Sequence, residues 1–103
     1  MARVILDDHN ARLLLAIADS RPVGTLIVTF DGWRGQMYRL AVLPEYQRRG
    51  IANALVREAE RWLATVGCRR IRATVVREHR WATAFWEAAG YSDDAVSYVR
   101  NLA

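Results

Sequence analysis

Residues 36–67 read QMYRLAVLPEYQRRGIANALVREAERWLATVG, and this stretch decides the fold. It begins as an apolar strand that Pro44 stops, and it continues as a helix over 50–66 whose apolar residues recur at intervals of three and four. The loop between them, QRRGIA at 47–52, aims unpaired backbone N–H groups and arginine side chains at one point. The stretch therefore predicts a strand–loop–helix unit with an anion site at the loop.

The loop matches neither of the two common phosphate-binding patterns, since GxxxxGK[ST] and GxGxxG are both absent. Gly50 removes a side chain where a phosphate oxygen would approach the backbone, and Ala52 is small for the same reason. Arg48 or Arg49 can supply a charge-assisted hydrogen bond. The local string also fits a basic helix start that holds no ligand, so both interpretations stay open at this point.

Composition indicates one globular domain over residues 1–103, with 52% apolar and 25% charged residues. No apolar run approaches the roughly 18 residues of a membrane span. The first ten residues lack the apolar core and cleavage site of a signal peptide. The lone Cys68 cannot form an internal disulfide. We therefore expect a cytoplasmic protein without a membrane partner.

The net charge of +4 comes from arginine, because the chain contains no lysine. A basic balance favours an anionic partner, either the phosphates of a cofactor or nucleic acid. Nucleic acid is disfavoured, since the sequence has no recognisable helix-turn-helix and no strand face that combines aromatic with basic residues. We expect no metal site.

The rest of the chain alternates between strand and helix patterns. Strands are predicted at 11–18, 23–30, 36–42, 71–76 and 95–102, and helices at 50–66 and 81–89. The strand–helix–strand series implies a right-handed crossover and parallel pairing of 36–42 with 71–76. The apolar residues near the N-terminus, Arg3–Leu6, look like the tail of an element whose beginning is missing. These elements predict one α+β sheet domain.

The order of these motifs resembles the acetyl-CoA-binding half of the GNAT superfamily of N-acetyltransferases. The signature [QR]-x-x-G-x-[GA] is matched by Gln47, Gly50 and Ala52, and the preceding V-x-P by Val42–Pro44. The closing helix ends in the family's aromatic and Gly-aromatic pattern as WEAAGY at 86–91. The resemblance implies a mixed, mostly antiparallel sheet of about five strands, with two helices and one parallel, splayed strand pair.

The resemblance also implies where acetyl-CoA would bind. The coenzyme would lie between strands 36–42 and 71–76, with the backbone of Leu40, Ala41 and Val42 paired to its pantetheine arm. His79 stands where the family commonly has a cofactor-contacting Asn, and Trp86 would lie against the pantetheine or acetyl end. The residues expected around the pyrophosphate are Gln47, Arg48, Arg49, Gly50, Ile51, Ala52 and Asn53.

The implied reaction is transfer of acetyl from the thioester to a primary amine. The backbone N–H of Val42 would polarise the thioester carbonyl. Many family members use a Tyr as general acid where this chain has Trp86, whose indole cannot supply a proton at useful pH. His79 and Tyr38 are the candidates to carry the proton, against a hydrogen-bonding role for His79 and a packing role for Tyr38.

The front of the chain departs from the family, whose members usually have a strand and two helices before the position of residue 11. An abbreviated front would leave an apolar sheet face uncovered, which predicts a homodimer. It also favours the alternative of a CoA-binding module that is non-catalytic or depends on a partner. The acceptor is not readable, because Asp31 could attract a cationic amine or could simply form a turn.

Overall fold

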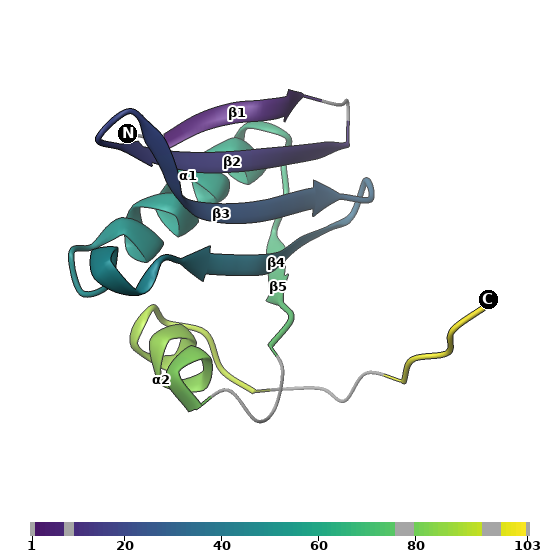
Figure 1. The fold of residues 1–103 in the computed structure, drawn as a ribbon. Helices are drawn as coiled ribbons and strands as arrows, with labels where there is room; N and C mark the ends of the chain where they lie inside the picture. Colours follow the sequence, from purple (N-terminus) through teal and green to yellow (C-terminus); the bar gives the residue numbers. More distant parts are fainter. Residues whose placement is uncertain (1, 8–9, 76–79, 94–97, 103) are drawn as a thin grey trace.

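The computed structural model describes residues 2–7, 10–75, 80–93 and 98–102. A mixed sheet carries two helices and one short 3₁₀ turn in this part of the chain (Figure 1). In chain order the elements are β1 (Ala2–Asp7), β2 (Ala11–Ala18), β3 (Arg21–Phe30), β4 (Arg34–Val42), η1 (Pro44–Tyr46), α1 (Ile51–Thr65), β5 (Arg70–Ala73) and α2 (Arg80–Ala88).

The sheet has five described strands in the order β1-β2-β3-β4-β5. The first four strands pair antiparallel, and β5 pairs parallel to β4 after the α1 crossover. The predicted α+β fold, with its mostly antiparallel sheet, two helices and one parallel strand pair, is confirmed. The strands predicted at 11–18, 23–30 and 36–42 and both helices are present with bounds that shift by two residues or fewer.

Two terminal segments differ from the sequence-based expectation. The N-terminal tail forms a strand, β1, which pairs with β2. The strand predicted at 95–102 is absent over Tyr98–Leu102, where Tyr98 is 96% exposed, while 95–97 lie outside the described residues. Alternation of apolar and polar residues indicates a segment that could pair with a strand. A strand forms only where the edge of a neighbouring strand is available for its hydrogen bonds. Of the strand predicted at 71–76, the described part ends at Ala73.

The core lies between one face of the sheet and α1. Residues at every second position of β2, β3 and β4 point to this face, and residues at helical spacing on α1 meet them. The fully buried side chains of this layer are Leu14, Val23, Leu26, Val28, Met37, Leu55, Val56 and Leu63. The opposite side of α1 carries ion pairs, between Arg57 and Glu60 and between Arg61 and Glu58.

Both helices end in a Schellman motif, which explains the glycines that follow them. After α1, Gly67 has φ 83° and Cys68 N donates to Leu63 O at 3.0 Å. After α2, Gly90 has φ 98° and Tyr91 N donates to Trp86 O at 2.9 Å. Glycine adopts the left-handed backbone conformation at little cost in free energy, so each glycine ends its helix at a defined residue.

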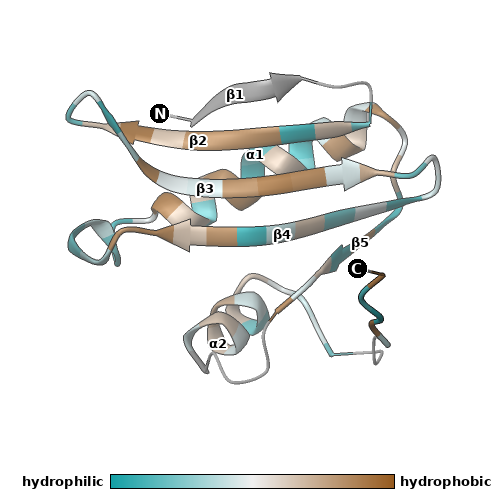
Figure 2. Cartoon of the chain, turned by 45° about the vertical axis from the view of Figure 1, so that its right-hand side comes forward, coloured by the Kyte–Doolittle hydropathy of each residue, from teal (hydrophilic) through white to brown (hydrophobic). Residues whose placement is uncertain are grey.

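The other face of the sheet is uncovered by the described helices, since α1 lies behind β2 and β3 as drawn (Figures 1 and 2). The side chains of Leu13, Leu15, Ile17 and Ile27 belong to this face, because they alternate with the buried positions, and they are partly exposed. Figure 2 shows that apolar residues run along both strands. The molecule therefore presents an apolar sheet face, which we call the open face.

Candidate coenzyme site

The parallel pair β4–β5 separates part way along β4. Pairing runs from Arg34 opposite Arg70 to Met37 opposite Ala73, and Thr74 N donates to Met37 O at 2.9 Å. Beyond Met37, β4 continues to Val42 with β3 as its paired neighbour. The edge of β4 from Tyr38 to Val42 therefore faces away from β3 toward the side on which α2 lies (Figure 1).

A bulge in β4 sets which backbone groups point to this edge. Arg39 has φ 58°, and the register with β3 shifts between Thr25 and Ile27. The Thr25 hydroxyl donates to Arg39 O at 3.1 Å and fastens the bulge. Bulges of this kind re-aim the strand that contains them.

The hydrogen bonds beyond the bulge orient Val42. Leu43 N donates to Val23 O at 2.9 Å, and in an antiparallel ladder every second residue points its N–H and C=O to the same neighbour. Leu43 and Ala41 therefore face β3, and Val42 between them turns its N–H and C=O to the open edge. This is the direction that a carbonyl-polarising N–H requires.

Gln47 ties the loop to this edge. Its side-chain amide Nε2 donates to Val42 O at 3.1 Å, so the carbonyl beside the outward Val42 N–H already has a partner. This hydrogen bond fixes the distance between β4 and the loop. Gln47 is exposed, and the contact with the pyrophosphate that the family resemblance implies for it stays a prediction.

The start of α1 leaves backbone donors without helical acceptors. The first helical bond of this turn runs from Ala54 N to Gly50 O at 3.0 Å, so the N–H groups of Ile51, Ala52 and Asn53 precede the ladder. Gly50 is the N-cap residue with φ 81°, and no described side chain caps this terminus. The helix dipole adds about half a positive charge at the same place.

The geometry of Gly50 and its neighbours fits a phosphate. A Cβ built on Gly50 would meet no atom within 4 Å, so the space beside its backbone is open. Arg48 also has a left-handed backbone, with φ 62°. Where right-handed and left-handed residues alternate in a loop, successive backbone N–H groups point into the same concave space. Of the residues that follow, Ile51 packs its side chain toward Gly24 and offers only its backbone, while Asn53 is exposed.

Tyr46, which was not among the predicted site residues, anchors the loop. Its ring is 8% exposed and its hydroxyl donates to a carboxylate oxygen of Asp19. The Arg49 guanidinium lies over this ring, 5.0 Å from the centroid. An aromatic residue three positions before an arginine in a short turn was the available signal. Arg48 and Arg49 are both exposed, so their charges are accessible to a ligand.

Helix α2 carries Trp86, which is 6% exposed and belongs to the core. Its indole meets Phe85 and Tyr91 edge to face, with centroids 5.2 and 4.9 Å away. Trp86 therefore packs against its own helix end, and a contact with the coenzyme stays a prediction. His79 lies outside the described residues. Tyr38 in β4 is partly buried and belongs to the open face. It directly follows Met37, the last residue of β4 that pairs with β5.

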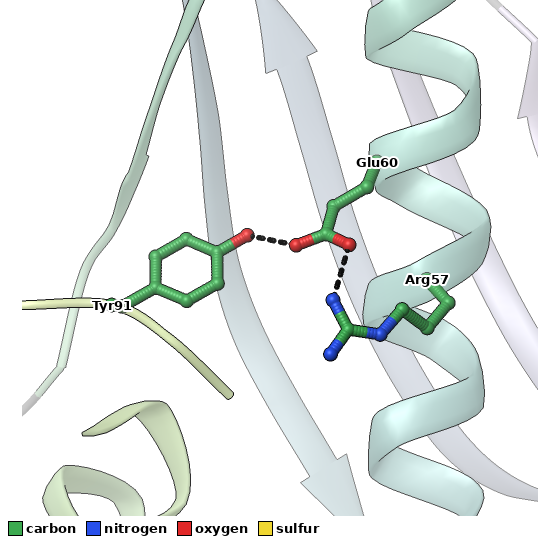
Figure 3. Close-up of polar contacts among 3 residues, drawn as sticks. All are labelled: Arg57, Glu60 and Tyr91. Atoms are coloured by element: carbon green, nitrogen blue, oxygen red, sulfur yellow. Dashed lines mark hydrogen bonds and ion pairs between the residues drawn. The ribbon is translucent and has the colours of Figure 1, made fainter. Parts of the chain in front are cut away.

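A hydrogen-bonded trio ties the end of α2 to α1 (Figure 3). The Tyr91 hydroxyl donates to Glu60 Oε2 at 2.6 Å, and Arg57 Nη1 donates to Glu60 Oε1 at 2.6 Å. Burial and the neighbouring carboxylate raise the pKa of Tyr91 well above its ordinary value, so the hydroxyl stays protonated as a donor. The trio holds the Tyr91 ring, and with it Trp86, in place.

A cavity of about 830 Å³ lies along β5 and the end of α2. Its walls include Arg70, Arg72, Trp86 and Tyr91, and the loop at 47–53 is not among them. The cavity is therefore separate from the donor-rich loop. In the turn between β3 and β4, Asp31 accepts hydrogen bonds from Arg34 N and Trp33 N at 2.7 and 2.8 Å, and these bonds lower the pKa of its carboxyl and show that it stabilises the turn.

The chain belongs to the acetyltransferase (GNAT) family, whose family model matches residues 1–91. Three solved structures illustrate the shared fold. A transcriptional regulator from Bacillus halodurans C-125 matches with TM-score 0.83 and 22% identity, over 92% of this chain and 68% of that one. An aminoglycoside N-acetyltransferase in complex with CoA matches with TM-score 0.82 and 22% identity, over 96% and 72%.

A ribosomal-protein-alanine N-acetyltransferase from Brucella melitensis matches with TM-score 0.78 and 23% identity, over 92% of this chain and 72% of that one. At these identities the likeness establishes the fold, and it does not assign an acceptor. Neither described helix is long and apolar enough to cross a lipid bilayer.

Proposed function

We propose that this protein is an N-acetyltransferase that transfers acetyl from acetyl-CoA to a primary amine. The observation that carries the proposal is the juxtaposition of the outward Val42 N–H with the uncapped start of α1, held together by Gln47. Family membership supports acetyl-CoA as the donor. The CoA in one of the structural neighbours agrees with this choice.

The loop and β4 would bind different parts of the coenzyme. When bound, acetyl-CoA would supply the acetyl group as a thioester. The loop from Arg48 to Asn53 would hold its pyrophosphate through backbone N–H groups and guanidinium charge. The edge at Leu40–Val42 would pair with the pantetheine arm. The Val42 N–H would then face the thioester carbonyl and stabilise negative charge on its oxygen.

Proton transfer lacks the family's usual acid in this chain, because Trp86 stands in its place. Losing a general acid costs roughly a hundredfold to ten-thousandfold in rate. A thiol is acidic enough, with a reference pKa near 8.5 for Cys, for the thiolate to leave without full assistance. We therefore propose a slow reaction that relies on positioning, with Tyr38 and His79 as the candidates to assist it.

The second candidate is a CoA-binding module that is non-catalytic or needs a partner to complete its site. The buried Trp86 favours it, since a 6% exposed indole at the usual acid position offers no proton donor to a ligand. Thiol release from acetyl-CoA across a panel of amines separates the two. Release with any amine above the no-amine rate supports the enzyme, while CoA binding without release supports the module.

Calorimetric titration with CoA tests both candidates together. Binding near micromolar is expected for wild-type protein. Arg49→Glu should weaken it more than about tenfold, because the change inverts the charge beside the pyrophosphate. Arg61→Glu is the control, since Arg61 is an exposed arginine on a later turn of α1. Unchanged affinity in Arg49→Glu would mean that the loop has been misassigned.

We further propose that two copies associate through the open face, in the cytoplasm. The partly exposed apolar residues of β2 and β3 support this assembly, because isologous pairing would bury the same surface on both copies. A dimer would also bring a second chain near the acceptor side of the site.

A further inference from the structure

We propose that Arg21, at the start of β3, is a further coenzyme-binding residue that contacts a phosphate of the coenzyme's nucleotide end. The inference rests on the proposed function and adds to it, because Arg21 lies outside the loop that carries the family signature. It starts from the tight hairpin between β2 and β3, which brings a second cation to the loop.

The hairpin has a two-residue turn, Asp19–Ser20, between the paired residues Ala18 and Arg21. Both turn residues are left-handed, with φ 51° and 62°, as a type I′ turn requires. The turn lies at the same end of the sheet as η1 and the loop (Figure 1). A rigid turn therefore delivers Arg21 to the neighbourhood of the α1 start.

Tyr46 joins the hairpin to the loop. Its hydroxyl donates to Asp19 from the hairpin, while the Arg49 guanidinium from the loop lies over its ring. The Arg21 guanidinium also lies over this ring, 5.6 Å from the centroid, compared with 5.0 Å for Arg49. One buried aromatic ring thus orients two cations from segments that are far apart in the sequence.

Two guanidinium groups and two carboxylates lie around this ring, and among the described residues Arg49 forms no ion pair. Asp19 accepts the Tyr46 hydroxyl, and Glu45 meets Arg21 only at 3.5 Å, with side chains 62% and 52% exposed. An exposed pair of this kind contributes little. Two guanidinium groups that share one ring repel each other, and a bound anion relieves that repulsion. The cluster is therefore prepared for a phosphate in addition to the one held by the α1 start.

Coenzyme A offers two kinds of phosphate at its nucleotide end, the diphosphate and the 3′-phosphate of the ribose. The loop N–H groups suit the diphosphate. Arg21 would reach either this group from the side or the 3′-phosphate beyond it. Titration with CoA and with dephospho-CoA, which lacks the 3′-phosphate, distinguishes the two sources.

The test compares Arg21→Gln with wild type and with Arg61→Gln by calorimetry with both ligands. Arg61 is a matched control, because it too is an exposed arginine that pairs with a glutamate. Arg21→Gln should weaken CoA binding about tenfold, as expected for a lost charge-assisted hydrogen bond, while Arg61→Gln should change it by less than about twofold. If the loss disappears with dephospho-CoA, Arg21 contacts the 3′-phosphate; if it persists, Arg21 contacts the diphosphate.

Arg21→Lys keeps the charge and should recover part of the affinity, and it also serves if Arg21→Gln fails to fold. Affinity within about twofold of wild type for Arg21→Gln with both ligands would overturn the inference. A wild-type protein that binds neither ligand would instead overturn the proposed function, and the role of Arg21 with it.

Discussion

Tyr91 shows how one side chain can fasten two elements. Its backbone N–H closes the Schellman motif of α2, its ring meets Trp86, and its hydroxyl reaches Glu60 on α1. The family pattern marks Tyr91 as an aromatic residue after a glycine. The partner on α1 could not be read from the sequence, because 31 residues separate the two positions.

The raised pKa of Tyr91 predicts a stability loss at alkaline pH. The folded state holds the hydroxyl proton more tightly than the unfolded chain, where tyrosine titrates near pH 10. The stabilisation of the folded state by the protonated Tyr91 hydroxyl is therefore complete below about pH 10, and it is lost as the pH rises from there toward the pKa of Tyr91 in the folded state. Urea unfolding of wild type and Tyr91→Phe between about pH 8 and about pH 11 measures it.

Tyr91→Phe should cost about 1 kcal/mol at neutral pH, because Glu60 keeps its hydrogen bond to Arg57. Above about pH 10 the difference between the two proteins should shrink, since the phenyl ring of the variant has no proton to lose. A difference that stays constant across this pH range would contradict the assigned role of the hydroxyl.

Gly35 in β4 illustrates a glycine required by close packing. A Cβ at this position would lie 2.7 and 2.8 Å from the two Leu63 methyl carbons and 3.0 Å from Cys68 Sγ. Gly35→Ala should therefore destabilise the protein by about 1–3 kcal/mol through overpacking between sheet and helix. Gly24→Ala, whose Cβ would meet Ile51 at 3.1 Å, should cost less. Equal chemical denaturation midpoints for Gly35→Ala and wild type would refute this account of the packing.

At the scale of elements, α1 begins and ends on left-handed glycines that serve different purposes. Gly50 and Gly67 have φ 81° and 83°, and an added Cβ would meet nothing within 4 Å at either position. The two sites therefore carry the same backbone strain when substituted, about 1–2 kcal/mol for an L-residue. They differ in that Gly50 stands at the proposed phosphate site and Gly67 at the far end of the helix.

This symmetry gives a matched pair of variants. Gly50→Ala and Gly67→Ala should lower thermal stability by similar amounts. Gly50→Ala alone should weaken CoA binding, by about tenfold or about 1.4 kcal/mol, because its methyl group stands where a phosphate oxygen approaches. Differential scanning calorimetry and titration calorimetry measure the two effects. Equal losses of CoA affinity would show that strain in α1, and not contact with the phosphate, governs binding.

The crossover unit β4–α1–β5 was readable from the sequence because its signals are local. Apolar periodicity, Pro44 after the strand and glycines at both ends of the helix are all properties of short windows. The segment 95–102 had the same kind of local signal, but the strand predicted from it is absent over Tyr98–Leu102. Pairing depends on which edge is available, and no short window reports that.

At the scale of the whole molecule, the open face predicts self-association. Light scattering at about tens of micromolar protein should give the mass of two chains. Ile27→Lys places a charge on the open face and should give a monomer, because a buried unpaired charge is costly at an interface. Val66→Lys, at an exposed position after α1, is the control and should stay dimeric. A monomeric wild type would exclude the dimer.

The sequence by itself predicted the α+β class from periodicity and turn chemistry, the family from the resemblance of its motifs, and residues 47–53 as the segment that we propose binds an anion. All of these signals lie within short windows. Only the tertiary structure decided that the Gln47 side chain hydrogen-bonds to Val42 O and that the guanidinium groups of Arg21 and Arg49 both lie over the Tyr46 ring. It also decided that β1 is the fifth described strand of the sheet. Each of these is a contact between residues whose distance in space depends on the whole chain path. Local preferences fix the elements, whereas pairing and packing fix their neighbours.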